Sequence, residues 1–214
     1  MLFRILTILL VLLVLLGASK LQAEVVKRVD LRRDTQAPGE YYVVICSRKS
    51  WPWGTGHSFV VWAEQTEAGL QTLGSGFYPG KDNVVLWLLS GLGRLSDEAE
   101  RPASTEPALL THRLIVRLDK QAYERSLAAR EKWLAAQHEY NIFTCNCTHF
   151  SFQVAQAIGL QPPEPRTCER PPFYIERMMN ACSEVPTRLP LPPDDPTRIA
   201  EPPQLRRLAA PHWR

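Results

Sequence analysis

The sequence predicts an α+β fold in which an antiparallel sheet of four or more strands packs against two consecutive helices. Two observations support this prediction. Short runs rich in valine, isoleucine and aromatic residues lie between residues 41 and 118. Two segments with apolar residues at helical spacing follow between residues 119 and 159, and the second is predicted to carry a cysteine at its N-terminus. Strands grouped ahead of helices are typical of the α+β class.

Four segments are predicted as strands because they are short, apolar and rich in β-branched or aromatic residues. They are residues 41–46 (YYVVIC), 57–63 (HSFVVWA), 70–78 (LQTLGSGFY) and 112–118 (HRLIVRL). The second and third are joined by a predicted hairpin turn in EQTEAG. The polar residues 24–40 are expected to be irregular or to form a lead-in strand.

Three helices are predicted. The first begins after Asp119, a good N-cap residue, and runs through Gln137. The second begins after Asn146 and ends at Gly159, ahead of a proline pair. A short third helix is expected over residues 174–181. The predicted apolar stripes are Tyr123, Leu127, Ala128 and Leu134 on the first helix, and Phe150, Val154, Ala157 and Ile158 on the second.

The two ends of the chain differ from its centre. Arg4 precedes an apolar run at residues 5–16. This run is close to a signal-peptide core and short of the about twenty residues that a membrane span needs. Residues 1–23 are therefore predicted to be a signal peptide or N-terminal anchor, with one domain at 24–183. Residues 184–214 hold eight prolines in 31 residues and are expected to be extended or disordered.

Composition narrows the functional classes. The 214 residues are 45% hydrophobic and 22% charged, which suits one domain with appendages and excludes a wholly disordered chain. Removing Arg4 and Lys20 from the 25 basic residues leaves 23 against 22 acidic ones, a net charge of +1 for the rest of the chain. A nearly neutral body lacks the basic surface of nucleic-acid-binding proteins, so that class is excluded. The export segment implies a periplasmic or secreted protein, or a membrane-anchored one if the segment is not cleaved.

One apolar stretch, residues 84–93 (VVLWLLSGLG), has two interpretations. It is too short to span a bilayer. It could be a short core helix or a cover over a cleft. As a cover it could also contact a membrane. Apart from this stretch, membrane contact is expected only through the N-terminal segment.

The chain has five cysteines, an odd number, so at least one thiol lacks an intramolecular partner in an oxidising compartment. Cys168 and Cys182 could link the C-terminal segment to itself or to the core. Cys46 lies inside an apolar run and is expected to be a buried small hydrophobic residue.

Cys147 and His57 are the candidate catalytic pair. Cys147 directly follows the predicted cap Asn146, where unpaired backbone N–H groups and the helix dipole stabilise a thiolate. His57 opens a buried strand and could supply the base if the sheet packs on the helix. A thiol and an imidazole in contact are what nucleophilic attack on a carbonyl requires at neutral pH.

The segment YNIFTCNCTHFSFQVAQAIG resembles the nucleophile segment of the circularly permuted papain-like proteins, which include NlpC-type hydrolases and lecithin:retinol acyltransferase-like enzymes. GHSFVVW is similar to the histidine strand of that family, and the order of histidine before cysteine is the permuted one. The resemblance covers residues 41–181. The matching positions in the nucleophile segment are Tyr140, Ile142, Phe143, Asn146, Cys147, His149 and Phe150.

The resemblance implies a permuted papain-like fold with Cys147 as the nucleophile, His57 as the general base and a third polar residue that orients the imidazole. The strand at 70–78 offers no His, Asp or Glu for that third role. His112 would reach His57 if its strand paired antiparallel with the strand at 70–78. Gln71, Ser75, Tyr78 or a backbone carbonyl are the alternatives. Tyr140 either helps to polarise the scissile carbonyl, as the resemblance suggests, or only packs at a helix end.

Other uses of the same residues remain open. Cys145 could be the nucleophile, although it lies before the predicted helix start and lacks the dipole. Cys145, Cys147 and His149, with His57 or His112, could form a zinc site, although alternating ligands depart from the usual spacing. His149 points away from Cys147 on a helix and is expected to be a structural hydrogen-bonding residue.

The predicted function is an exported thiol hydrolase that cleaves an amide or peptide bond through Cys147 and His57, without a metal or other cofactor. A cell-wall peptide is the natural substrate if the host is bacterial. The same site could instead act as an acyltransferase or esterase on lipids. A catalytically inactive binding domain is the third alternative.

Overall fold

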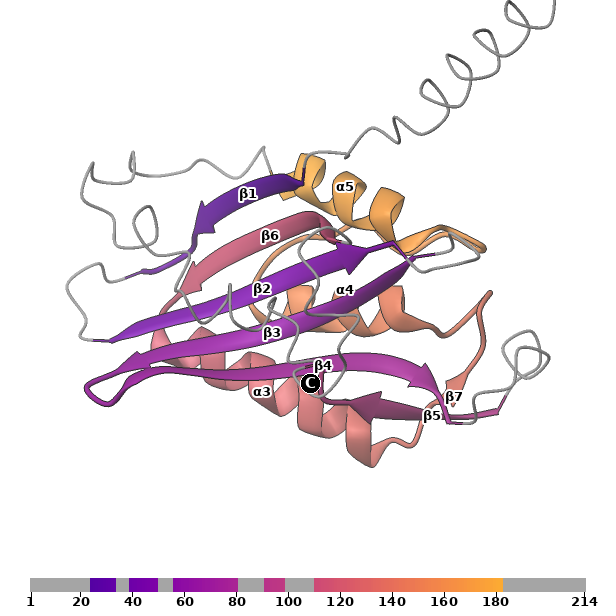
Figure 1. The fold of residues 1–214 in the computed structure, drawn as a ribbon, viewed down its shortest axis with the longest axis horizontal. Coiled ribbons are helices and arrows are strands. Elements are labelled where there is room, and N and C mark those ends of the chain that lie inside the picture. Colours follow the sequence, from indigo (N-terminus) through magenta and orange to yellow (C-terminus); the bar gives the residue numbers. More distant parts are fainter. Residues whose placement is uncertain (1–23, 34–38, 50–55, 81–90, 99–109, 183–214) are drawn as a thin grey trace, which may run out of the picture.

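The computed structural model describes residues 24–33, 39–49, 56–80, 91–98 and 110–182. In these ranges the chain forms one seven-stranded sheet with three helices against one face (Figure 1). The α+β prediction is therefore confirmed. The strands are β1 (Val25–Asp30), β2 (Glu40–Arg48), β3 (His57–Thr66), β4 (Gly69–Pro79), β5 (Gly91–Ser96), β6 (Leu110–Leu118) and β7 (Glu139–Tyr140). The helices are α3 (Lys120–Ala135), α4 (Cys147–Ala157) and α5 (Pro171–Ala181).

The sheet is mixed, which corrects the antiparallel prediction. Its strand order is β1-β6-β2-β3-β4-β5-β7, and β1 runs parallel to β6 while the other pairs are antiparallel. Strand β6 lies between β1 and β2, so the pairing of the His112 strand with β4 was wrong. The physical reason is burial on both faces: Leu114 and Val116 face the helices while Ile115 faces the opposite side, which suits an interior strand.

The four predicted strands correspond to β2, β3, β4 and β6, each slightly longer than expected. The lead-in alternative is confirmed by β1. Strand β5 begins within the apolar stretch predicted as a core helix or cover, so its last residues, 91–93, belong to a strand. Residues 84–90 lie outside the described residues, as do the predicted export segment and the proline-rich tail.

Helix α3 begins as predicted, because the Asp119 carboxylate accepts a hydrogen bond from the Ala122 backbone at 2.7 Å. It ends at Ala135 rather than Gln137, whose φ of 48° is left-handed and cannot continue a helix. Its buried face also differs from the prediction, since Trp133 is buried while Leu134 is exposed. Ala128 is exposed as well.

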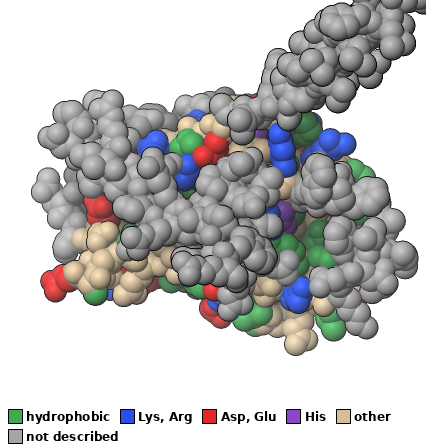
Figure 2. Space-filling view, viewed as in Figure 1, with side chains coloured by type: hydrophobic (Ala, Val, Ile, Leu, Met, Phe, Trp, Pro, Cys, Tyr) green, Lys and Arg blue, Asp and Glu red, His purple; other side chains and the backbone are tan. Residues whose placement is uncertain are grey.

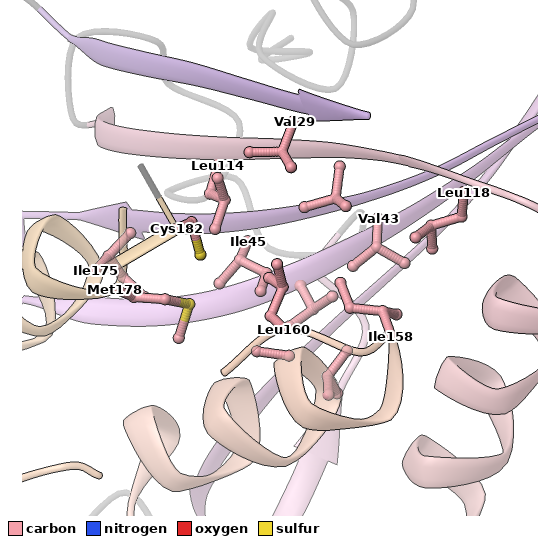
Figure 3. Packing of buried hydrophobic residues seen from close by; sticks show 14 of the residues in the cluster. Val29, Val43, Ile45, Leu114, Leu118, Ile158, Leu160, Ile175, Met178 and Cys182 are labelled. Carbon is pink, nitrogen blue, oxygen red and sulfur yellow. The ribbon is translucent and has the colours of Figure 1, made fainter. Parts of the chain in front are cut away.

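The main core lies between the sheet and the helices (Figure 3). Val43 and Ile45 of β2 meet Ile158 and Leu160 at the end of α4. The predicted stripe on α4 is confirmed in that Phe150, Val154 and Ile158 are buried and Ala157 is partly buried. Helix α5 begins three residues earlier than predicted, at Pro171, because proline is tolerated in the first helical turn.

The opposite face of the sheet carries a second apolar cluster that includes Val44, Cys46, Phe59 and Val61. Cys46 is buried there as predicted, and burial raises the pKa of its thiol to about 12. On the visible part of this face, basic and acidic side chains are interspersed (Figure 2). Among the described residues, no helix combines the length and apolar character needed to cross a membrane.

Candidate active site

Cys147 is the first residue of α4, as predicted, and Asn146 is the N-cap. The Asn146 side-chain oxygen accepts a hydrogen bond from the Thr148 backbone at 2.9 Å. His149 Nδ1 in turn accepts from the Asn146 backbone N–H at 3.3 Å, which completes a capping box. His149 is therefore a structural hydrogen-bonding residue, as expected. This cap fixes the Cys147 thiol at the positive end of the helix.

Cys147 and His57 interact, as the sequence predicts. Burial favours the neutral thiol, but the His57 ring and hydrogen bonds from Ser58 outweigh it and lower the pKa of Cys147. Burial also opposes a charge on His57, but Cys147 and Glu98 outweigh it and raise the pKa of the imidazole. Opposite shifts of this kind favour a thiolate–imidazolium pair, which is the nucleophilic form.

Glu98, two residues after β5, lies against the His57 ring. Its Oε1 is 3.3 Å from His57 Nε2, and both side chains are almost completely buried. The two atoms are close enough for an ion pair but not aligned for a hydrogen bond. Because Nε2 faces the carboxylate, Nδ1 is the ring nitrogen left to interact with the Cys147 thiol.

Glu98 is itself held by two neighbours. Arg48 Nη1 donates to Oε2 at 3.1 Å, and the Tyr78 hydroxyl donates to Oε1. Burial raises the pKa of the carboxyl, but His57, Arg48 and Tyr78 outweigh it and lower the pKa to about 2. The carboxylate is therefore charged at every physiological pH and can stabilise an imidazolium at His57.

His112 does not lie where the prediction placed it. Strand β2 separates its strand from that of His57, and His112 Nδ1 is 3.3 Å from the Ser47 hydroxyl. Burial lowers the pKa of this imidazole. The structure thus places Glu98, rather than His112, beside the candidate base. Of the alternatives weighed for the orienting role, Tyr78 is part of the same cluster, with its ring stacked on His57 at 4.1 Å between centroids.

Tyr140 is the second residue of β7 and packs on Phe77, with 5.4 Å between ring centroids. Burial, followed by the nearby charges of Cys147 and Cys145, raises the pKa of its phenol, so the hydroxyl stays protonated. Tyr140 is therefore a packing residue whose hydroxyl keeps its proton. Cys145 pairs with Asn141 before the helix start, and burial raises the pKa of its thiol. These surroundings make Cys145 the weaker nucleophile.

Three further residues of the site were missed by sequence reasoning: Glu98, Arg48 and Ser58. Ser58 follows His57 on β3, and its hydroxyl accepts from the Ser151 hydroxyl on α4 at 3.1 Å. One signal could have located Glu98. A glycine inside a strand often marks a close approach of other atoms, and Gly76 of β4 leaves the space that Glu98 and His57 occupy.

All five cysteines are free, so the pairing considered for Cys168 and Cys182 is not formed. Within the described ranges, no group of three or more His, Cys, Asp or Glu residues could hold a metal ion. The zinc alternative therefore has no support in this part of the chain. What the site does contain is a thiol at a helix start, an imidazole and a buried carboxylate.

The chain was compared with family models, curated proteins and solved structures, and no significant match was found in any of the three. The likeness to permuted papain-like proteins therefore rests on the residues of this chain.

Acidification provides a test of the buried carboxylate. The folded-state pKa of Glu98, about 2, lies below the value of about 4.3 expected in an unfolded chain. Above about pH 4.3 the ionised carboxylate therefore adds to the free energy of unfolding, and this contribution is lost as the pH falls toward 2. We expect the free energy of unfolding, measured by urea denaturation, to fall less over this range in Glu98→Gln than in the wild type. Equal falls would contradict the assignment.

Proposed function

We propose that the protein is a thiol hydrolase of the permuted papain-like type that cleaves an amide or peptide bond. The observation that carries the proposal is the contact between Cys147 at the start of α4 and His57, with the opposite pKa shifts that result. The Cys147 thiolate attacks the carbonyl carbon and forms an acyl-enzyme. His57 gives its proton to the leaving nitrogen, and then takes a proton from the water that releases the acid.

The neighbours of the pair suit this chemistry. Glu98 stabilises the imidazolium that accompanies the thiolate. The Tyr140 hydroxyl, kept protonated near Cys147, can donate to the oxygen on which negative charge develops. A cell-wall peptide is the substrate that fits an exported enzyme of this type, and the export itself is part of the proposal.

Two alternatives have one observation each in their favour. Burial favours an inactive binding domain, because Cys147 exposes only 3% of its surface and His57 6%. A cavity with five apolar side chains in its lining, beside Arg94, Gln137 and His138, favours an acyltransferase or esterase that acts on lipids. Its volume is about 280 Å³, and Phe77, which contacts Tyr140, is one of its walls. The other apolar walls are Leu92, Leu95, Trp133 and Leu134.

Alkylation by iodoacetamide tests the proposal directly, with peptide mapping to follow each cysteine. We expect the Cys147 rate to rise less steeply with pH around neutrality than that of an ordinary thiol, because His57 and Ser58 lower the pKa of Cys147. The exposed Cys168 in the same molecule serves as the internal comparison. A Cys147 rate that is slow at pH 7 and rises tenfold per pH unit would favour the inactive domain.

Substrate preference separates the two enzymatic functions. Purified protein is incubated with cell-wall peptide fragments and with acyl esters, with Cys147→Ser as the inactive control. Release of new amino groups from the fragments supports the amide hydrolase. Turnover of acyl esters alone would replace it with the lipid enzyme.

A further inference from the structure

Arg48, the last residue of β2, is a buried cation beside the proposed active site. It pairs with His57 across the two strands, and only 7% of its surface is exposed. Its Nη1 donates to Glu98 Oε2 at 3.1 Å, and its Nη2 donates to the Tyr78 hydroxyl at 2.8 Å. The guanidinium also lies over the Phe59 ring, 5.5 Å from its centroid.

These contacts use the two arms of one guanidinium for two different neighbours of His57. Glu98 is held through Oε2, which leaves Oε1 to face His57 Nε2 at 3.3 Å. Tyr78 is held through its hydroxyl, while its ring stacks on the imidazole. The Tyr78 hydroxyl also donates to Oε1, so the three groups form a closed ring of hydrogen bonds.

We propose that Arg48 is a positioning residue for the Cys147–His57 pair, which it aligns by holding Glu98 and Tyr78 against the imidazole. This inference rests on the proposed function, because it assigns Arg48 a task in that site. Arg48 acts through Glu98 and Tyr78 rather than on the reacting atoms. A guanidinium fork suits this task because its planar arms hold two acceptors in a fixed geometry, whereas the ammonium of a lysine is a point charge on a flexible stem.

The groups around the His57 imidazole explain what the positive charge of Arg48 contributes to the site. His57 on β3 faces the Cys147 thiol of α4, the Glu98 carboxylate after β5 and the Tyr78 ring of β4. Without Arg48, more of the negative charge of Glu98 would act on His57 and hold its proton more tightly. By sharing that charge, Arg48 leaves His57 able to release the proton to a leaving group.

Three variants test the inference. Arg48→Met removes both donating arms, and Arg48→Lys keeps the charge but not the fork. Arg117→Met is the matched control, because Arg117 also pairs with a glutamate, Glu40, and lies 5.9 Å from the centroid of an aromatic ring. Thermal unfolding establishes that each variant is folded. The readouts are the iodoacetamide rate of Cys147 as a function of pH and the NMR titration of the His57 ring.

We expect Arg48→Met to lower the Cys147 rate at pH 7 about tenfold. Without the two hydrogen bonds from Arg48, the imidazole is no longer held against the thiol, and this loss outweighs the gain from a higher His57 pKa. We also expect its His57 ring to titrate at a higher pH than in the wild type. Arg48→Lys should recover the titration more fully than the rate, and Arg117→Met should change neither.

One outcome would contradict the role of Arg48 alone, and another would contradict the proposed function. A folded Arg48→Met with the wild-type rate and the wild-type titration of His57 would restrict Arg48 to a structural ion pair and leave the proposed function intact. If the wild type itself shows the reactivity of an ordinary thiol, the proposed function fails. If Arg48→Met does not fold, Arg48→Lys is the test. A wild-type Cys147 rate in Arg48→Lys would show that the guanidinium fork is not needed to position the pair.

Discussion

His57→Ala is expected to slow the alkylation of Cys147 at pH 7 by roughly 30-fold. Without the imidazole, the thiol returns to an ordinary pKa of about 8.5 or higher, at which only about 3% is ionised at pH 7. Burial adds to this effect because it opposes the charged form of Cys147. Hydrolysis should fall further, by about 10²–10⁴-fold, because proton transfer to the leaving group is lost as well.

The control for this experiment is His112→Ala. His112 is also buried and also lies on a strand of the sheet, but it contacts Ser47 and lies on the far side of β2 from His57. Its replacement should leave the Cys147 rate within about twofold of the wild type, since no charge at the thiol changes. A loss as large as that of His57→Ala would restore the role predicted for His112 from the sequence.

Gly76→Ala is expected to separate the two charged partners of the site. A Cβ at this position would lie 2.2 Å from Glu98 Oε1 and 2.6 Å from His57 Nε2, so at least one of them must move. We expect a loss of about 1–3 kcal/mol in the free energy of unfolding, typical of an overpacked interior. We also expect at least a tenfold fall in the Cys147 rate, because the displaced carboxylate no longer stabilises the imidazolium that accompanies the thiolate.

Gly91→Ala is the matched control, because a Cβ on this β5 residue meets no atom of the described residues within 4 Å. Urea unfolding and iodoacetamide labelling are measured on both variants. If Gly76→Ala keeps the wild-type reactivity of Cys147, the contact between Glu98 and His57 has no part in activating the thiol.

The elements that could be predicted are those whose signals are local. Asp119 and Asn146 mark the starts of α3 and α4 through their own side-chain hydrogen bonds, which the sequence places within three residues of the cap. The apolar runs of β2 and β3 have strong strand composition. Cys147 and His57 were found because each lies at the start of such an element.

Glu98 could not be found in the same way, because its position depends on pairing between distant segments. It reaches His57 only because β5 adds to the edge of β4, where Ser96 pairs with Gly76. The apolar stretch that leads into β5 carries no alternation, so periodicity does not distinguish a strand from a buried helix. The pairing of β6 with β2 is also non-local, and as a result His112 lies away from the site.

The cap of α4 has a consequence for producing the protein. Asn146, Cys147 and Thr148 also form an acceptor sequence for N-linked glycans. In the folded chain the Asn146 amide nitrogen donates to the Ile142 carbonyl at 2.7 Å, and its amide oxygen accepts a hydrogen bond from the Thr148 backbone N–H. A eukaryotic secretory host that attached an oligosaccharide to the nascent chain would replace one of the two N–H hydrogens of this amide and place a bulky sugar beside the nucleophile. Expression in a host without that pathway keeps the thiol at its helix start.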